Sequence, residues 1–256
     1  MAISQPLTRN VNEKVLLRED APFLKLGKAV VKVARSSPRW SSFIRNSAQA
    51  RSRLEVLRTC QGLGAIPEAL LEDFNDAYYL RNLIKCSYVT SVVLPLLPRS
   101  LLHPYFDVGA GLGTFTHAIS SRLHDDSIRF VLLDRSCDQL KRADALTGAL
   151  NLQGSFSFEV GEVGIASISR LREGFLLASY SLCELSAQHF ASDLIPSAMG
   201  AAIVDYPEII ESIVVAAMKR ERAVIHDFVE LELPSSISGI IGQERIKVAY
   251  AIVLPS

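Results

Sequence analysis

The sequence predicts an α/β fold built on a mostly parallel sheet, and three observations support this prediction. A turn with glycines at alternate positions, residues 109 to 113, stands between an apolar strand-like segment and an amphipathic helix. Short apolar runs then alternate with helical patterns as far as residue 218. Two β-rich runs, Ala223–Leu233 and Ile246–Leu254, follow with a loop rather than a helix between them, which predicts a terminal antiparallel pair.

The glycine-rich turn predicts a site for a nucleotide-like ligand. A ligand can lie there against bare backbone, above the unpaired N–H groups and positive dipole end of the following helix. Dinucleotide-binding loops have the spacing G-x-G-x-x-G, whereas this loop has Asp107 followed by Gly109, Ala110, Gly111 and Gly113. The G-x-G-x-G spacing and the preceding acid favour S-adenosylmethionine over NAD. A tight turn without a ligand is the alternative.

The segments after the loop predict a regular alternation of helix and strand. Phe115–Leu123 has helical spacing, Arg129–Leu133 is a continuous apolar run, and Leu140–Leu150 predicts a second helix. The strand ends in Asp134, about twenty residues beyond the last glycine, where a carboxylate can accept hydrogen bonds from ribose hydroxyls. We therefore include Asp134, with Arg135 beside it, among the cofactor-binding residues. A helix cap is the alternative role for Asp134.

Three further strands follow in order. Residues 155–160 alternate polar and apolar side chains, and Phe175–Ala178 and Ala201–Val204 are apolar runs that predict buried strands. The helical pattern of Ile209–Met218 follows the last of them. Together with the terminal pair, these segments account for a seven-stranded sheet.

The run from Asp107 to Gly113 resembles the first motif of the class I methyltransferases, D/E-x-G-x-G-x-G. The resemblance covers about residues 104–256 and implies a Rossmann-like seven-stranded sheet that binds S-adenosylmethionine and releases S-adenosylhomocysteine. In that family the acid of the motif helps to hold the amino-acid end of the cofactor. An acid after strand three meets the adenine amino group, which makes Glu162, with Val163 beside the ring, our candidates. A solvated glutamate in a turn is the alternative.

A second resemblance is more local. Residues 178–185, Ala-Ser-Tyr-Ser-Leu-Cys-Glu-Leu, are similar to the A-S-Y-x-L-x-E-L segment of methyltransferase-like proteins associated with assembly of the small ribosomal subunit. Those proteins carry a cysteine cluster for an iron–sulfur centre, and this chain has four widely separated cysteines instead. His103 and His117 are isolated and no metal-ligand spacing appears in the sequence, so we expect no metal site. The segment places Ser179 at the end of a strand, where it joins the cofactor-binding candidates.

Charge divides the chain into two regions. Residues 1–100 contain fifteen Lys or Arg and eight Asp or Glu, a net charge of +7, and the remainder carries −7. We expect a basic N-terminal helical region at 1–100, forming a substrate roof, and a cofactor-binding domain at 101–256. No segment has the length of a membrane span or the apolar core of a secretory signal, and the cysteines lack C-x-x-C spacing. These features predict a cytoplasmic protein.

A basic helix face stands out in the N-terminal region. Lys25, Lys28, Lys32 and Arg35 recur at helical spacing, with apolar residues on the opposite side. The face predicts contact with RNA phosphates or attraction of an acidic substrate, and a solvated or internally packed face is the alternative. Whether the chain is a monomer or a homodimer stays open at this stage.

Candidate catalytic residues follow strands four and five, because ligands bind beyond the carboxyl ends of strands in open α/β sheets. We expect Tyr180, Asp205 and Glu208 to face the methyl acceptor and, where the acceptor must lose a proton, to supply a base. The neutral total charge favours a small-molecule acceptor. An RNA or ribosome-directed methyltransferase is the first alternative, and a non-catalytic assembly factor that binds S-adenosylmethionine is the second.

Overall fold

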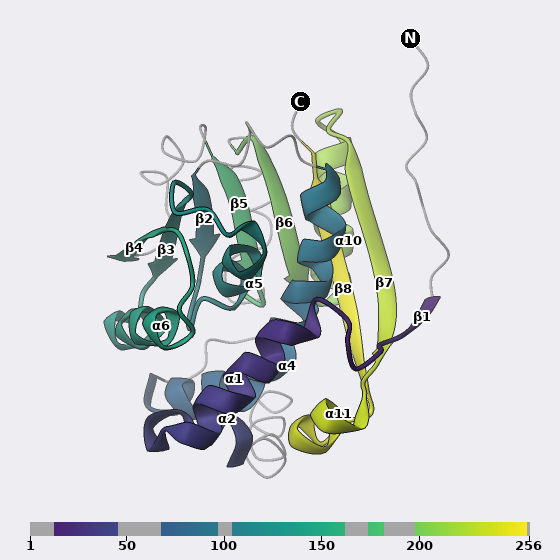
Figure 1. The fold of residues 1–256 in the computed structure, drawn as a ribbon. Coiled ribbons are helices and arrows are strands. Elements are labelled where there is room, and N and C mark those ends of the chain that lie inside the picture. Colours follow the sequence, from purple (N-terminus) through teal and green to yellow (C-terminus); the bar gives the residue numbers. More distant parts are fainter. Residues whose placement is uncertain (1–12, 46–67, 97–103, 162–173, 182–197, 255–256) are drawn as a thin grey trace.

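The computed structural model describes residues 13–45, 68–96, 104–161, 174–181 and 198–254. Within these residues the chain forms one eight-stranded sheet with the order β1-β7-β8-β6-β5-β2-β3-β4 (Figure 1). The strands are β1 (Glu13–Leu16), β2 (Tyr105–Val108), β3 (Arg129–Asp134), β4 (Ser155–Val160), β5 (Phe175–Ser179), β6 (Gly200–Asp205), β7 (Val224–Glu232) and β8 (Arg245–Val253).

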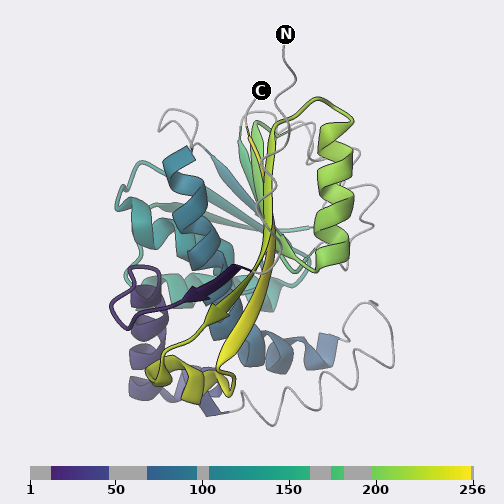
Figure 2. The same ribbon diagram turned by 90° about the vertical axis from the view of Figure 1, so that its right-hand side faces the viewer.

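The helices lie on both sides of this sheet. Figure 2 shows α10 on one side and α4 on the other. The α-helices are α1 (Leu24–Ser36), α2 (Ser42–Arg45), α4 (Glu68–Val93), α5 (Thr114–Leu123), α6 (Cys137–Ala149), α10 (Pro207–Met218) and α11 (Ser235–Ile241), and the 3-10 turns are η1 (Pro38–Trp40) and η2 (Leu94–Leu96). The predicted α/β fold is therefore confirmed. No described helix has the length and apolar character needed to cross a bilayer.

The central strands are buried on both faces because successive side chains point to opposite sides of the sheet. In β5, Phe175 and Leu177 pack into the core beneath α4 and α5, whereas Leu176 and Ala178 pack against α10. Both β2 and β6 divide their side chains in the same way. Each large apolar side chain buried here contributes about 1.5–3 kcal/mol, which explains why these strands are continuous apolar runs.

The terminal antiparallel pair is also confirmed. β8 inserts between β6 and β7 and pairs antiparallel with both. The sequence analysis missed β1, an eighth strand that pairs parallel with the outer edge of β7. β1 has only four residues, and Glu13 and Lys14 interrupt its apolar pattern, so no periodicity marks it.

The segment between the two terminal strands corrects a prediction. We expected a loop, but α11 occupies Ser235–Ile241. Ile237 and Ile241, one helical turn apart, are buried, and Gly242 ends the helix with a φ of 70°. Three serines among seven residues obscured this single apolar face.

The order of the strands determines where a ligand can bind. From β2 the chain moves outward through β3 and β4, then returns to the other side of β2 as β5 and continues to β6. The carboxyl ends of β2 and β5 therefore flank the point at which the strand order reverses. In open α/β sheets ligands bind in the crevice at this point.

Candidate functional site

The glycine-rich loop connects β2 to α5 and has the tight geometry that the sequence predicts. Gly109, Gly111 and Gly113 have φ values of 61°, 52° and 75°, in the left-handed region that favours glycine. A Cβ at Gly109 would lie 2.4 Å from Ser181 Cβ, and one at Gly113 would lie 2.8 Å from Leu132 Cδ2. Backbone conformation and space therefore both require glycine at these two positions.

Asp134 directs its carboxylate toward this loop. Its Oδ2 accepts a hydrogen bond of 2.7 Å from the backbone N–H of Gly111, and its Oδ1 accepts one of 2.8 Å from Ser136 N. The N-cap of α6 is Ser136, whose Oγ accepts from Gln139 N. Asp134 is therefore not the cap, and it lies beside the glycine loop at the tip of β3. Arg135, next in the chain, is exposed.

Asp107 lies beneath the loop and is only 2% exposed. Its Oδ2 accepts hydrogen bonds from the backbone N–H and the hydroxyl of Thr116, at 3.0 and 2.8 Å, in the first turn of α5. Burial raises the pKa of Asp107 from its ordinary value of 3.8 to about 7, against the opposing effect of the Thr116 bonds. The Asp107 carboxyl group therefore holds the first turn of α5 by hydrogen bonds, and it gains or loses its proton near neutral pH.

The long helix α4 brings side chains to the site that the sequence analysis missed. The side-chain amide of Asn75 lies over the loop, with Nδ2 3.7 Å from the place a Cβ at Gly111 would occupy. Farther along the helix, Cys86 Sγ donates to Ser179 Oγ at 3.3 Å. Burial raises the pKa of the Cys86 thiol to about 12, so this thiol stays protonated. No spacing in the sequence connects α4 to the glycine loop.

A buried hydrogen-bonded chain joins α4, α5 and α6 behind the loop. The Tyr79 hydroxyl lies 2.7 Å from His117 Nδ1, and His117 Nε2 lies 2.9 Å from Thr147 Oγ1. Thr147 donates its own proton to the carbonyl of Ala143, so it accepts from Nε2. Burial lowers the pKa of His117 to about 3, which keeps the ring neutral. The chain fixes α5, and with it the glycine loop, against its two neighbours.

Tyr180 occupies a constrained position directly after β5. Its φ is 55°, an uncommon value for a bulky residue and one that is frequent at functional sites. Lys85 of α4, itself 4% exposed, donates to the Tyr180 hydroxyl at 2.5 Å, and its Nζ lies 4.5 Å from the centre of the ring. The Tyr206 ring meets the Tyr180 ring edge to face, with centroids 5.4 Å apart. Lys85 is a third α4 residue that the sequence analysis missed.

The other acceptor-side candidates occupy different environments. Asp205 ends β6 and is 1% exposed, and its Oδ1 accepts from the N–H of Tyr206. β5 and β6 pair in parallel with Ser179 opposite Val204, so Asp205 follows at the same sheet edge as Tyr180. Glu208 lies in the first turn of α10 and is exposed. The adenine-contact candidates Glu162 and Val163 lie outside the described residues.

The basic face of α1 divides into two parts. Lys28 forms an ion pair of 2.8 Å with Glu19, which also accepts from the Ser236 hydroxyl of α11. Lys32 and Arg35 are exposed and, with Lys28, line a hollow of about 540 Å³ between α1 and α11. Lys25 faces a different cleft. Part of the predicted basic face is thus internally paired, and part is open to solvent.

Comparisons with known proteins give a fold and no closer relationship. No family model matches the sequence, and no curated protein matches it. The structure resembles precorrin-6y C5,15-methyltransferase from Geobacter metallireducens, with a TM-score of 0.50 and 10% identity over 67% of this chain and 87% of that one. At this identity the likeness concerns the fold, which is that of the class I methyltransferases.

Two further structures are similar to this chain at lower scores. A SAM-dependent methyltransferase from Aquifex aeolicus aligns with a TM-score of 0.46 and 14% identity over 74% of this chain and 100% of that one. The tRNA (uracil-54, C5)-methyltransferase of Pyrococcus abyssi, in complex with S-adenosyl-L-homocysteine, aligns with a TM-score of 0.36 and 12% identity over 66% and 38%.

Proposed function

Because the chain has the class I methyltransferase fold, we propose that it binds S-adenosylmethionine and transfers the methyl group to a small-molecule acceptor. The glycine loop is the observation that carries this proposal. Three glycines with positive φ follow β2 at the point where the strand order reverses, and carboxylates lie beneath and beside them. A loop in which Gly109 and Gly113 cannot bear a side chain, next to acids, suits a cofactor with a positive charge and a ribose.

The proposal divides the cofactor among three parts of the site. Asp107 and the loop backbone would face the amino-acid end, and Asp134 would accept from the ribose hydroxyls. We propose further cofactor contacts from the sequence. They are Gly109, Ala110, Gly111, Gly113, Arg135, Glu162, Val163 and Ser179. When bound, the cofactor supplies an electrophilic methyl group on a sulfonium.

On the acceptor side, Tyr180 is the residue we propose to hold or remove the acceptor's proton. Lys85 directs an ammonium N–H at the phenolic oxygen, which stabilises negative charge there. Tyr206 covers one edge of the ring and helps to fix its orientation. Asp205 and Glu208 stay candidates for binding a cationic part of the acceptor. Lys85 acts through Tyr180 and is a positioning residue.

An RNA-directed methyltransferase is a second candidate, supported by the exposed cations of α1. Lys25, Lys32 and Arg35 lie within three turns of one helix and are exposed. The pairing of Lys28 with Glu19 removes one member from such a surface. A small acceptor fits better with the half-buried Tyr180 after β5 and the buried Lys85 of α4 that contacts it.

The experiment that tests the proposal follows the methyl group. The protein is incubated with methyl-labelled S-adenosylmethionine and, separately, with the small-molecule and RNA fractions of a cell extract. We expect label in the small-molecule fraction, with the rate reduced at least about tenfold in Tyr180→Phe and little changed in the matched control Tyr105→Phe. Label in RNA alone would overturn the choice of acceptor. Cofactor binding without transfer to either fraction would overturn the enzymatic assignment.

A further inference from the structure

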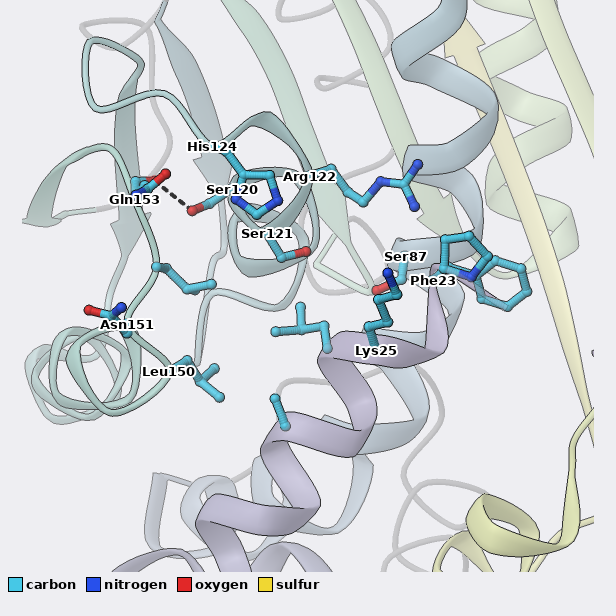
Figure 3. Close-up of a pocket in the computed structure, with 14 residues that line it drawn as sticks. Phe23, Lys25, Ser87, Ser120, Ser121, Arg122, His124, Leu150, Asn151 and Gln153 are labelled. Carbon is cyan, nitrogen blue, oxygen red and sulfur yellow. Dashed lines mark hydrogen bonds between the residues drawn. The ribbon is translucent and has the colours of Figure 1, made fainter. Parts of the chain in front are cut away.

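A separate cleft lies on the helical side of the sheet. It has a volume of about 620 Å³ and is walled by the start of α1, by Ser87 of α4, by the C-terminal end of α5 and by residues 150–153 (Figure 3). The glycine loop lies at the other end of α5, and the ten residues of that helix span about 15 Å. The cleft is therefore distinct from the proposed cofactor site. Pockets that bind small molecules have volumes of about 300–1,000 Å³.

The cleft is lined by positive charge. Lys25 and Arg122 supply this charge, His124 also lines the cleft, and the described lining residues include no Asp or Glu. Within the part of the chain that the structure describes, neither Lys25 nor Arg122 forms an ion pair. Figure 3 shows Lys25 extending from α1 toward Ser87, with Arg122 on the same side of the cleft in this view. Two cations without carboxylate partners favour an anionic ligand.

Ser87 gives independent evidence for a ligand. It is 4% exposed, and its Oγ is a buried atom with no hydrogen-bond partner among the described residues. Buried hydroxyls in native proteins nearly always have a partner, and one without a partner calls for an explanation. Because Ser87 lines the cleft, a ligand oxygen there would receive its hydrogen bond.

Two rim residues add polar groups at positions where glycine is usual. His124 and Asn151 follow α5 and α6 with φ values of 46° and 51°. Glycine adopts these values at little cost, whereas His and Asn place a polar side chain at the rim. Apolar lining comes from Leu26 of α1 and from Leu150 and Leu152 after α6. The cleft thus combines cationic, polar and apolar lining residues.

We propose that this cleft binds a phosphorylated small molecule with an apolar body. The phosphate lies between Lys25, Arg122 and the Ser87 hydroxyl, which together offer donors to several of its oxygens. The apolar body rests against Leu26 and Leu150. The site is independent of the proposed methyl transfer and belongs to a second ligand.

Amide resonances of the isotope-labelled full chain test this site with three probes. Phenyl phosphate supplies both the anionic head and the apolar body, inorganic phosphate supplies the head alone, and phenol supplies the body alone. We expect saturable shifts at Ser87, Arg122 and Gln153 with phenyl phosphate, weaker shifts with inorganic phosphate, and the weakest with phenol. Absence of saturable shifts at these amides with phenyl phosphate overturns the proposal.

Variants separate a ligand site from a merely basic surface. Lys25→Gln should weaken phenyl phosphate binding about tenfold, and Lys32→Gln, on the same helix but outside the cleft, should leave it unchanged. Ser87→Ala should weaken binding while the fold keeps its thermal stability. Equal affinity in Lys25→Gln and the parent would mean that Lys25 does not contact the phosphate, and would overturn the proposal. So would binding of an oligonucleotide that Lys25→Gln and Lys32→Gln weaken equally.

Discussion

The protonation of Asp107 should control how tightly the cofactor site binds a cation. Its carboxyl is buried with a pKa of about 7, so near neutral pH it is divided between the acid and the carboxylate. A cofactor ammonium interacts favourably with the carboxylate only. We expect S-adenosylhomocysteine to bind about tenfold more tightly at about pH 8 than at about pH 6, as the ionised fraction rises. Calorimetric titration at the two pH values measures the change.

Asp107→Asn is the control for this prediction, because the amide keeps the shape and cannot ionise. The variant should bind more weakly at the higher pH and lose the pH dependence. His117 does not interfere, since its pKa of about 3 lies below this window. Folding should show the opposite trend. The folded-state pKa of Asp107 lies above the ordinary value of 3.8 that the unfolded chain has. Its contribution to the free energy of unfolding is therefore complete below about pH 3.8 and is lost as the pH rises through about 7. A parent protein whose affinity does not change with pH would contradict the assigned role.

The contribution of the buried hydrogen bonds behind the loop to stability can be tested with two buried tyrosines, one that takes part in them and one that does not. Tyr79→Phe leaves His117 Nδ1 without its partner and should cost about 1–3 kcal/mol of unfolding free energy. Tyr105 is equally buried, but its hydroxyl has no partner among the described residues, so Tyr105→Phe should be neutral or stabilising. Urea unfolding measures both. Equal losses of unfolding free energy in the two variants would mean that the hydrogen bonds of Tyr79, His117 and Thr147 add nothing to stability.

At the scale of single elements, two glycines should respond in opposite ways to alanine. Gly27 lies within α1 where it crosses α4, and a Cβ there would be 3.6 Å from Ile84 and Leu80, an ordinary packing distance. Gly27→Ala should therefore raise the unfolding free energy by about 0.5–1 kcal/mol. Gly109→Ala should lower it, because the Cβ would overlap Ser181 at a φ of 61°. Thermal unfolding of the two variants checks the signs, and stabilisation by Gly109→Ala would contradict the loop geometry.

Elements with strong periodicity or a continuous apolar run were predictable from sequence. The β4 bounds agree to the residue, and α5, β3 and β5 differ by one residue at an end. β1 and α11 were not predictable, because one is a four-residue edge strand and the other a seven-residue helix. Elements this short depend on what they pack against, and the sequence does not give that information.

At the scale of the whole molecule, the sequence predicted the loop and not the helix that covers it. Local spacing marked the glycines, Asp107 and Asp134, since the glycines directly follow β2 and the two acids lie near the carboxyl ends of β2 and β3. Lys85 reaches Tyr180 across 95 residues of chain, and only the packing of α4 against the sheet brings the two together. The same packing places Asn75 over Gly111. Long-range contacts of this kind leave no pattern in a single sequence.

The central claim is that the glycine loop holds an S-adenosyl group, and calorimetry with S-adenosylhomocysteine tests it most directly. Gly111→Ala is the informative variant. Its Cβ would meet nothing closer than Asn75 at 3.7 Å, so the fold should tolerate the φ of 52° at a cost of about 1–2 kcal/mol while the binding surface gains a methyl group. We expect saturable one-to-one heat with the parent and with Gly27→Ala, and at least about tenfold weaker binding in Gly111→Ala. No heat with S-adenosylhomocysteine, together with saturable binding of NADH, would contradict the account.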